Sequence, residues 1–209
     1  KMQEKQNNTS LIWFRNNLRV NDNISLQKAA ENHKKVIAVY FFDPKLFKVD
    51  EFGFKKTAKF RAKFIIETVA ELKQNLSKLN ITLLTYLESP EDKIHIICDE
   101  FSIEAIYTQK EWTKEEVSTN NFINTVSNDF SKIPNVFTQF RKKLEKTVEI
   151  QETLSISKLL ESNLIQNTTE IPTLRDLGFN DFKENIKTAF PFSGGENTAL
   201  KRLENYFFE

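Results

Sequence analysis

The sequence predicts an α/β protein, a three-layer α/β/α domain with a five-stranded parallel sheet that is followed by a linker and one terminal helix. Continuous apolar runs recur along the first 140 residues, and such runs are typical of parallel strands buried on both faces. Segments with apolar residues at helical spacing lie between these runs. Strands that alternate with helices favour a doubly wound sheet, because parallel neighbours need a crossover connection.

The first expected strand is LIWF, residues 11–14, and it ends abruptly in a polar loop that contains Arg15, Asn17 and Arg19. Ligands of open α/β sheets bind beyond the carboxyl ends of the strands, so this loop lies where chemistry is expected. Surface ion pairing of the two arginines is the simpler alternative, since every fold of this class has such loops. The polar segment through Asn8 is expected to fray.

Polar residues and prolines mark the remaining elements. Asp22 or Asn23 can cap a first helix, because their side-chain oxygens accept bonds from unpaired first-turn amides. Pro44 ends the second strand, since proline lacks the N–H that a strand ladder needs, and Pro90 suits the first turn of a helix. Further strands are expected over 36–42, 81–87, 105–108 and 136–140, and further helices from residues 57, 89, 113 and 196.

The longest predicted helix, which Thr57 opens, has one apolar face. Charged residues such as Glu67 and Glu71 fall largely outside this face. We expect the apolar stripe to be core and to have no role in cofactor binding. Its members recur at spacings of four and three residues: Ile65, Val69, Leu72, Leu76 and Leu79.

The composition excludes several classes of function. Thirty basic and 29 acidic residues give a formal charge of +1, so no global charge attracts nucleic acid or an anionic membrane. We expect a soluble, cytoplasmic protein, because no apolar run approaches the ~20 residues that span a bilayer and no signal-peptide pattern opens the chain. Cys98 is the single cysteine, which precludes an internal disulfide. The two histidines, His33 and His95, argue against a zinc cluster or a histidine-based hydrolase.

The glycines give no sign of a phosphate-binding loop. Only four are present, and none forms G-x-G-x-x-G or a P-loop, which counts against an ordinary NAD domain or a nucleoside triphosphatase. The segment 109–112 follows the fourth strand as the arginine loop follows the first. There the Glu111 carboxylate can accept paired N–H donors of a heterocycle, with Trp112 nearby for stacking. A solvated carboxylate at a helix start is the alternative for Glu111.

Five longer motifs resemble, in the same order, signatures of the photolyase/cryptochrome family, and most closely its DASH cryptochrome branch. They cover almost the whole chain, and several independent motifs in the correct order are far more specific than one short pattern. The motifs are LIWFRNNLRVNDN, VIAVYFFDP, FGFKKTAKFRAKFIIETVAELKQNL, TQFRKKLEK and SGGENTALKRLENYF.

This resemblance implies a domain organisation. Residues 9–140 would form a Rossmann-like antenna domain, 141–195 an interdomain linker, and 196–209 the first helix of an FAD-binding helical domain that this chain lacks. In the family, the antenna domain holds a light-harvesting folate, methenyltetrahydrofolate, which passes excitation energy to FAD. The helical domain receives a flipped pyrimidine dimer from DNA and repairs it by light-driven electron transfer, or serves in blue-light sensing. We therefore expect a monomer without a membrane partner, and no catalysis from this chain alone.

The resemblance also implies site residues. Phe14, Arg15, Lys110 and Glu111 would border the folate crevice, with Glu111 hydrogen-bonded to the pterin ring, and Glu115 is the rival if the register differs by one turn. One departure is Asn17, where the family usually has Asp, because this change removes a partner for a nearby arginine. A deazaflavin antenna, a free-standing nucleotide-binding protein and a noncatalytic interaction module remain alternatives.

Overall fold

The computed structural model describes residues 6–111, 152–183, 185, 187–188 and 191–208. The chain divides into two compact units, one formed by Lys1–Gln109 with Leu154–Glu209 and the other by Lys110–Thr153. The fold below is that of the first unit.

The centre of this unit is a parallel β-sheet, as predicted. Its four strands are β1 (Gln6–Phe14), β2 (His33–Phe41), β3 (Leu83–Tyr86) and β4 (Ile103–Thr108), arranged in the order β3-β2-β1-β4. All three neighbouring pairs are parallel. The described sheet thus has four strands, and the fifth that the sequence predicts, over 136–140, lies outside the described residues.

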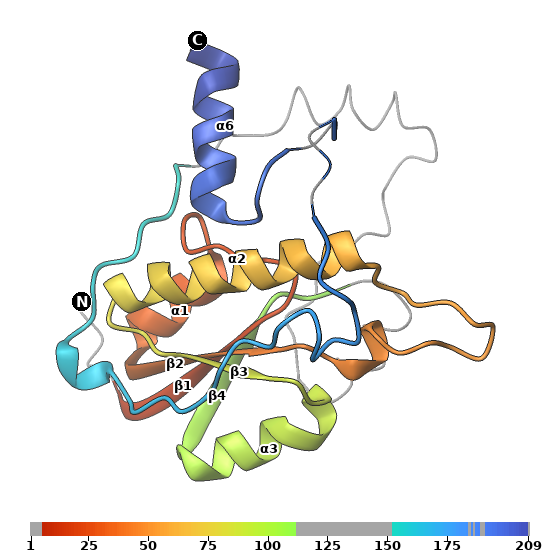
Figure 1. Ribbon diagram of the computed structural model, residues 1–209. Coiled ribbons are helices and arrows are strands. Elements are labelled where there is room, and N and C mark those ends of the chain that lie inside the picture. The colour runs from red at the N-terminus through yellow and green to blue at the C-terminus, as the bar shows by residue number, and fades with distance from the viewer. Residues whose placement is uncertain (1–5, 112–151, 184, 186, 189–190, 209) are drawn as a thin grey trace, which may run out of the picture. The chain divides into compact units, whose positions relative to one another are not determined.

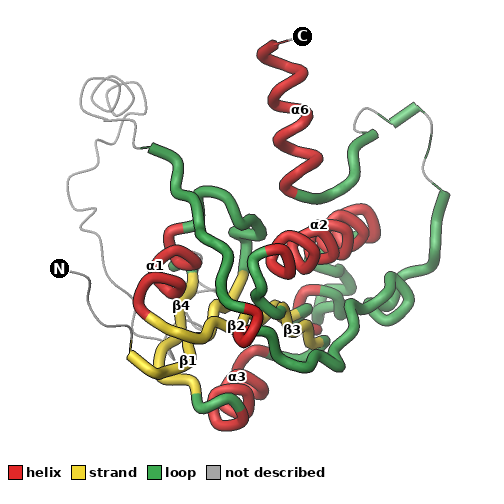
Figure 2. Tube along the Cα trace, turned by 90° about the vertical axis from the view of Figure 1, so that its left-hand side faces the viewer, coloured by secondary structure: helices red, strands yellow, loops and turns green. Residues whose placement is uncertain are grey.

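Helices cover both faces of the sheet and complete the three layers. Figures 1 and 2 show α1 (Ile24–Asn32) and α2 (Lys59–Lys78) on one face and α3 (Pro90–Glu100) on the other. Two short 3₁₀ turns, η1 (Pro44–Leu46) and η2 (Glu161–Asn163), and the terminal helix α6 (Glu196–Phe208) are the remaining helical elements of the described chain. The helix starts follow the sequence closely: Asn23 caps α1 by accepting a bond from the Leu26 amide at 3.2 Å.

The core lies between the sheet and the α1–α2 layer. Ile12 and Phe14 of β1 and three residues of β2 belong to it. The residues between them along each strand are buried too, so both faces of these strands are covered, which explains the continuous apolar runs. The predicted stripe on α2 is confirmed, because Val69, Leu72 and Leu76 are buried in this core and the other two members pack against it.

The start of β1 differs from the prediction. β1 begins at Gln6 rather than Leu11, so the expectation of fraying is wrong for residues 6–8, while residues 1–5 lie outside the described part of the chain. The polar residues are accommodated because each buried one has a partner: Asn8 donates from Nδ2 to Glu104 at 2.6 Å, and the Ser10 hydroxyl lies 3.4 Å from the Lys35 carbonyl oxygen.

The irregular segment after residue 152, which the sequence predicts to be a linker, packs on the sheet and provides hydrogen-bond partners for the edge strand β3. The Thr169 hydroxyl accepts a bond from the Thr85 amide at 2.9 Å, and Asn167 donates from Nδ2 to the Leu83 carbonyl oxygen at 2.8 Å. These bonds satisfy backbone groups of an edge strand that would otherwise be unpaired and exposed.

His33 belongs to a buried polar cluster at the start of β2. Its Nδ1 lies 2.8 Å from Asn8 Oδ1 and its Nε2 lies 3.1 Å from the Tyr107 hydroxyl, while Glu104 holds the Asn8 amide. Burial lowers the pKa of His33 below 6.5, and the charge of Glu104 opposes this shift only in part. The imidazole is therefore more costly to protonate in the folded protein than in the unfolded chain.

We expect this cluster to make folding less stable in mild acid. The unfolded chain takes up a proton on His33 at a higher pH than the folded protein, so the free energy of unfolding falls as the pH drops below about 6.5. Denaturant titrations at pH 7.5 and 5.5 measure this fall. His33→Gln should reduce the fall, whereas His95→Gln, at an exposed site on α3, should leave it unchanged. A fall of the same size in all three proteins would contradict the assignment.

Candidate functional site

The strand order places a topological switch point between β1 and β4. The chain adds β2 and β3 on one side of β1 and returns to add β4 on the other. The two strands end level, since Trp13 pairs with Thr108 and the Thr108 hydroxyl donates to the Trp13 carbonyl oxygen at 3.0 Å. Carboxyl ends of strands at a switch point are where open α/β sheets bind their ligands.

The loop after β1 is held by its own polar groups. Asn17 Oδ1 accepts a bond from the Arg15 amide at 3.2 Å, and the Asn17 carbonyl oxygen accepts one from the Arg19 amide at 2.7 Å. An asparagine at this position therefore still organises the loop. The Arg15 guanidinium lies 5.0 Å from the centre of the Trp13 ring, a distance at which cations bind aromatic faces.

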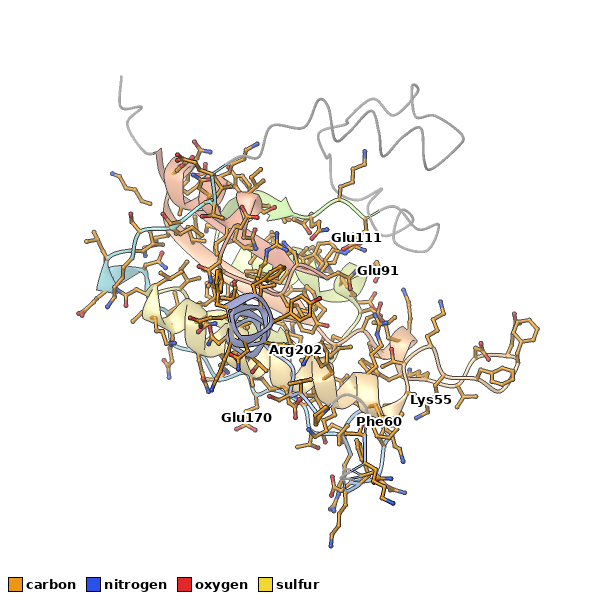
Figure 3. All side chains as sticks on the ribbon, turned by 90° about the horizontal axis from the view of Figure 1, so that it is seen from above. Lys55, Phe60, Glu91, Glu111, Glu170 and Arg202 are labelled. Carbon is orange, nitrogen blue, oxygen red and sulfur yellow. The ribbon has the colours of Figure 1, made fainter. Side chains whose placement is uncertain are left out.

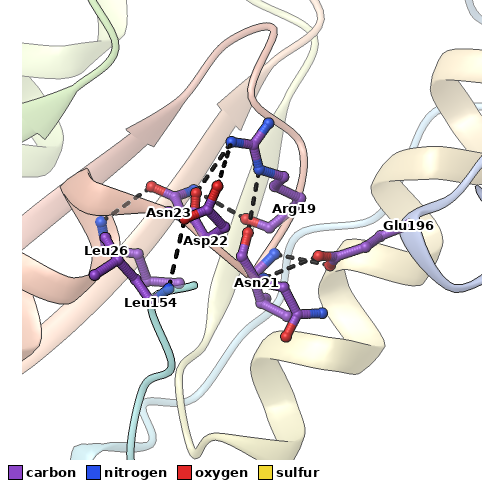
Figure 4. A network of polar contacts seen from close by, with 8 residues as sticks. Arg19, Asn21, Asp22, Asn23, Leu26, Leu154 and Glu196 are labelled. Carbon is purple, nitrogen blue, oxygen red and sulfur yellow. Dashed lines mark hydrogen bonds and ion pairs between the residues drawn. The ribbon is translucent and has the colours of Figure 1, made fainter. Parts of the chain in front are cut away.

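The second half of the loop is closed by Arg19. Its guanidinium donates to the carbonyl oxygens of Asn21 at 3.1 Å and Asp22 at 3.0 Å, and Asn23 donates from Nδ2 to the Arg19 carbonyl oxygen at 2.9 Å (Figure 4). The ion pair of Arg19 with Asp22 is exposed and long, at 3.7 Å, so the bonds to backbone carbonyls dominate. Arg19 thus stabilises the loop mainly through bonds to its backbone, and we call this set of bonds the Arg19 clamp.

The predicted site residues fall into different parts of the chain. Phe14 and Arg15 belong to the first unit, and the Phe14 side chain is completely buried in the core, so only its backbone can border a ligand. Lys110 and Glu111 open the second unit, and Glu111 is buried, with 8% of its surface exposed. Glu115 and Trp112 lie outside the described residues.

One residue of this region was missed by the sequence analysis, which treated Glu196 only as the first residue of a terminal helix. Both of its carboxylate oxygens accept backbone N–H groups of the loop after β1, from Val20 at 2.8 Å and from Asn21 at 2.9 Å. The two glycines just before Glu196 were the available signal, because adjacent glycines allow backbone to approach another element closely.

A separate apolar cavity of about 260 Å³ lies between α2 and α6. Phe64, Phe192 and Leu203 are among its walls, and the Arg202 guanidinium lies 4.0 Å from the centre of the Phe192 ring. Figure 3 looks along α6 and shows Arg202 on that helix.

Within the described residues, no cluster of histidine, cysteine and acidic side chains is arranged to hold a metal ion, and no helix is long and apolar enough to cross a membrane.

Comparisons with known proteins agree with the fold and the motifs. A family model described as DNA photolyase matches residues 10–124, more than half of the chain. The Cryptochrome DASH of Gloeobacter violaceus is 35% identical over 96% of this chain and 45% of its own length. The crystal structure of a Synechocystis cryptochrome matches with a TM-score of 0.78 and 27% identity over 98% of this chain and 47% of that one.

An archaeal photolyase from Sulfolobus tokodaii, whose crystal structure contains two FAD molecules, shares the fold with a TM-score of 0.69 and 20% identity over 93% of this chain and 46% of that one. This chain thus spans about half the length of the curated relatives it matches. The family match, the DASH relatives and the α/β fold of the photolyase N-terminal domain together lead to one conclusion: the chain belongs to the photolyase/cryptochrome family.

Proposed function

We propose that this chain is the antenna domain of a DASH-type photolyase or cryptochrome and that it binds methenyltetrahydrofolate. The observation that carries the proposal is the switch point at β1 and β4, because these strands end level, β1 leads into the loop of Arg15, and the chain continues from β4 to Lys110 and Glu111. The chain has no glycine-rich phosphate loop, which disfavours a dinucleotide or a nucleoside triphosphate as the ligand.

The residues carried over from the family have chemistry that suits a folate. A carboxylate such as Glu111 can accept two parallel N–H bonds from a pterin ring, which fixes the orientation of the ring. Arg15 and Lys110 can bind the carboxylates of the folate tail, and the Phe14 backbone would border the ring. Glu115 is the alternative carboxylate. The bound folate would supply light absorption, with FAD in the longer protein as the acceptor of its energy.

The rest of the family's activity would depend on a helical domain. We propose that α6 is the first helix of that domain in a longer protein, and that FAD binding, DNA binding and repair of pyrimidine dimers or blue-light sensing reside there. A flipped base needs a pocket and an electron donor, and in this proposal the antenna domain provides neither. This chain alone should therefore not repair DNA.

We expect the purified chain to bind methenyltetrahydrofolate saturably, and Glu111→Gln to weaken binding at least about tenfold, because a bond from a charged acceptor is worth about 1.5–3 kcal/mol. Absorption and fluorescence titrations measure both affinities. Glu31→Gln, an exposed change on α1, is the matched control and should bind as the wild type does.

Two results would count against the proposal. Equal affinity of the Glu111→Gln variant and the wild type would remove Glu111 from the site. Binding of an adenine nucleotide in place of the folate would instead support a free-standing nucleotide-binding protein.

A further inference from the structure

The first turn of α6 is joined to the loop after β1 by a single carboxylate. Glu196 Oε2 accepts the Val20 amide and Oε1 accepts the Asn21 amide, so both oxygens are used on consecutive residues (Figure 4). Bonds to an ionised acceptor are about twice as strong as neutral ones, and the paired geometry fixes orientation as well as distance. Acidic residues in a first helical turn usually complement the helix dipole, but here the carboxylate also binds a segment 175 and 176 residues away.

Two further carboxylates, both on α2, bind the first turn of α6 and the glycine two residues before it. Glu67 accepts a bond from the Gly194 amide at 2.8 Å, and Glu71 accepts one from the Asn197 amide at 2.6 Å. These two glutamates are four residues apart and therefore lie on one face of α2. They provide acceptors for N–H groups that have no partner within a helix end. No residue of α6 is buried, so these hydrogen bonds of its first turn, and not burial, hold the start of the helix in place.

On the loop side, the contacts continue to the candidate site. Val20 and Asn21 are enclosed by the Arg19 clamp, the Arg19 amide binds the Asn17 carbonyl oxygen, and the Asn17 side chain binds the Arg15 amide. A shift of the Val20–Asn21 backbone must therefore strain or break bonds that hold Arg15. These hydrogen bonds form a continuous path from the start of α6 to Arg15, the residue that follows β1.

We propose that Glu196 is a positioning residue that couples the first turn of α6 to the loop of Arg15. A perturbation of the turn loosens the loop, and by linkage a ligand that orders the loop stabilises the turn. The statement about the ligand rests on the proposed folate function, whereas the coupling of turn and loop does not.

Amide hydrogen exchange of the isotope-labelled chain, read by NMR, tests the coupling without a ligand. Glu196→Ala should speed the exchange of the Val20 and Asn21 amides about tenfold, because it removes their acceptors. Glu71→Ala touches only the α2 side of the turn, yet it should also speed those two amides several-fold. In the double variant Glu71→Ala/Glu196→Ala, the Val20 and Asn21 amides should exchange no faster than in Glu196→Ala alone, since the path through Glu196 is already broken. Glu204→Ala, at an exposed position of α6, is the matched control.

The outcomes separate this inference from the proposed function. Unchanged exchange of Val20 and Asn21 in Glu71→Ala, or additive effects in the double variant, would overturn the coupling. With saturating methenyltetrahydrofolate, the Asn197 amide of the wild type should exchange more slowly, and Glu196→Ala should abolish this protection. If the wild type binds no folate, the proposed function fails, and the ligand-free exchange data still decide the coupling.

Discussion

Asn163→Ala should lower the free energy of unfolding by about 3 kcal/mol, because it leaves three buried backbone groups without partners. The Asn163 side chain is 3% exposed and lies beside β2, where it bonds the backbone of Val36. Its Oδ1 accepts the Val36 amide at 2.8 Å, and its Nδ2 donates to the carbonyl oxygens of Val36 at 3.0 Å and Asn80 at 2.7 Å. The Asn163 side-chain amide therefore provides hydrogen-bond partners for both backbone groups of Val36. It also binds the carbonyl oxygen of Asn80, which lies between α2 and β3. Chemical denaturation measures the loss.

Two variants sharpen this prediction. Ser162→Ala changes the exposed neighbour in the same 3₁₀ turn and should stay within about 0.5 kcal/mol of the wild type. Asn163→Asp keeps an acceptor for the Val36 amide but turns a second oxygen toward two carbonyls, so it should be at least as destabilising as alanine at neutral pH. An Asn163→Ala protein as stable as Ser162→Ala would show that water replaces the amide at no cost.

The elements that the sequence predicted well are those whose signals are local. The apolar runs of β1 and β2 and the stripe on α2 report burial directly, because a buried face needs apolar residues at the period of its backbone. The cap at Asn23 and the helix start at Pro90 depend on a few neighbouring residues. Errors arose where polar residues are buried. Asn8 and Ser10 look like a solvated chain end until their partners, Glu104 and the Lys35 carbonyl, are known.

The residues that hold the linker and α6 in place carry no such local signal. Asn163 binds Val36 across 127 positions of sequence, and Glu196 binds Val20 across 176. Each lies in or after an irregular, charged segment, where Asn and Glu are ordinary surface residues. Glu67 and Glu71 are predicted to fall largely outside the apolar face of α2, and they do, but both bind backbone at the start of α6. Periodicity separates core from surface, and it cannot say which surface another element covers.

Gly194→Ala should loosen the start of α6 and lower the free energy of unfolding by about 2 kcal/mol, which is typical of a side chain forced into a packed contact. A Cβ at this position would overlap the Phe64 carbonyl oxygen and the Thr68 hydroxyl of α2, and would lie 3.1 Å from the Thr68 amide nitrogen. The main obstacle is backbone, so rotation of a side chain cannot relieve it. The bond from the Gly194 amide to Glu67 should break as the turn moves away.

Denaturation and exchange of the Asn197 amide test this prediction together, since that amide depends on the same anchor through Glu71. Ser193→Ala, one residue earlier and exposed, is the matched control and should change neither quantity. Thr68→Ala combined with Gly194→Ala removes the hydroxyl but leaves the carbonyl of Phe64 in place, so it should not restore the anchor. If Thr68→Ala restored the stability of the Gly194→Ala protein, the steric conflict would lie with the Thr68 side chain. If Gly194→Ala changed neither the free energy of unfolding nor the exchange of the Asn197 amide, α6 would not need its close approach to α2.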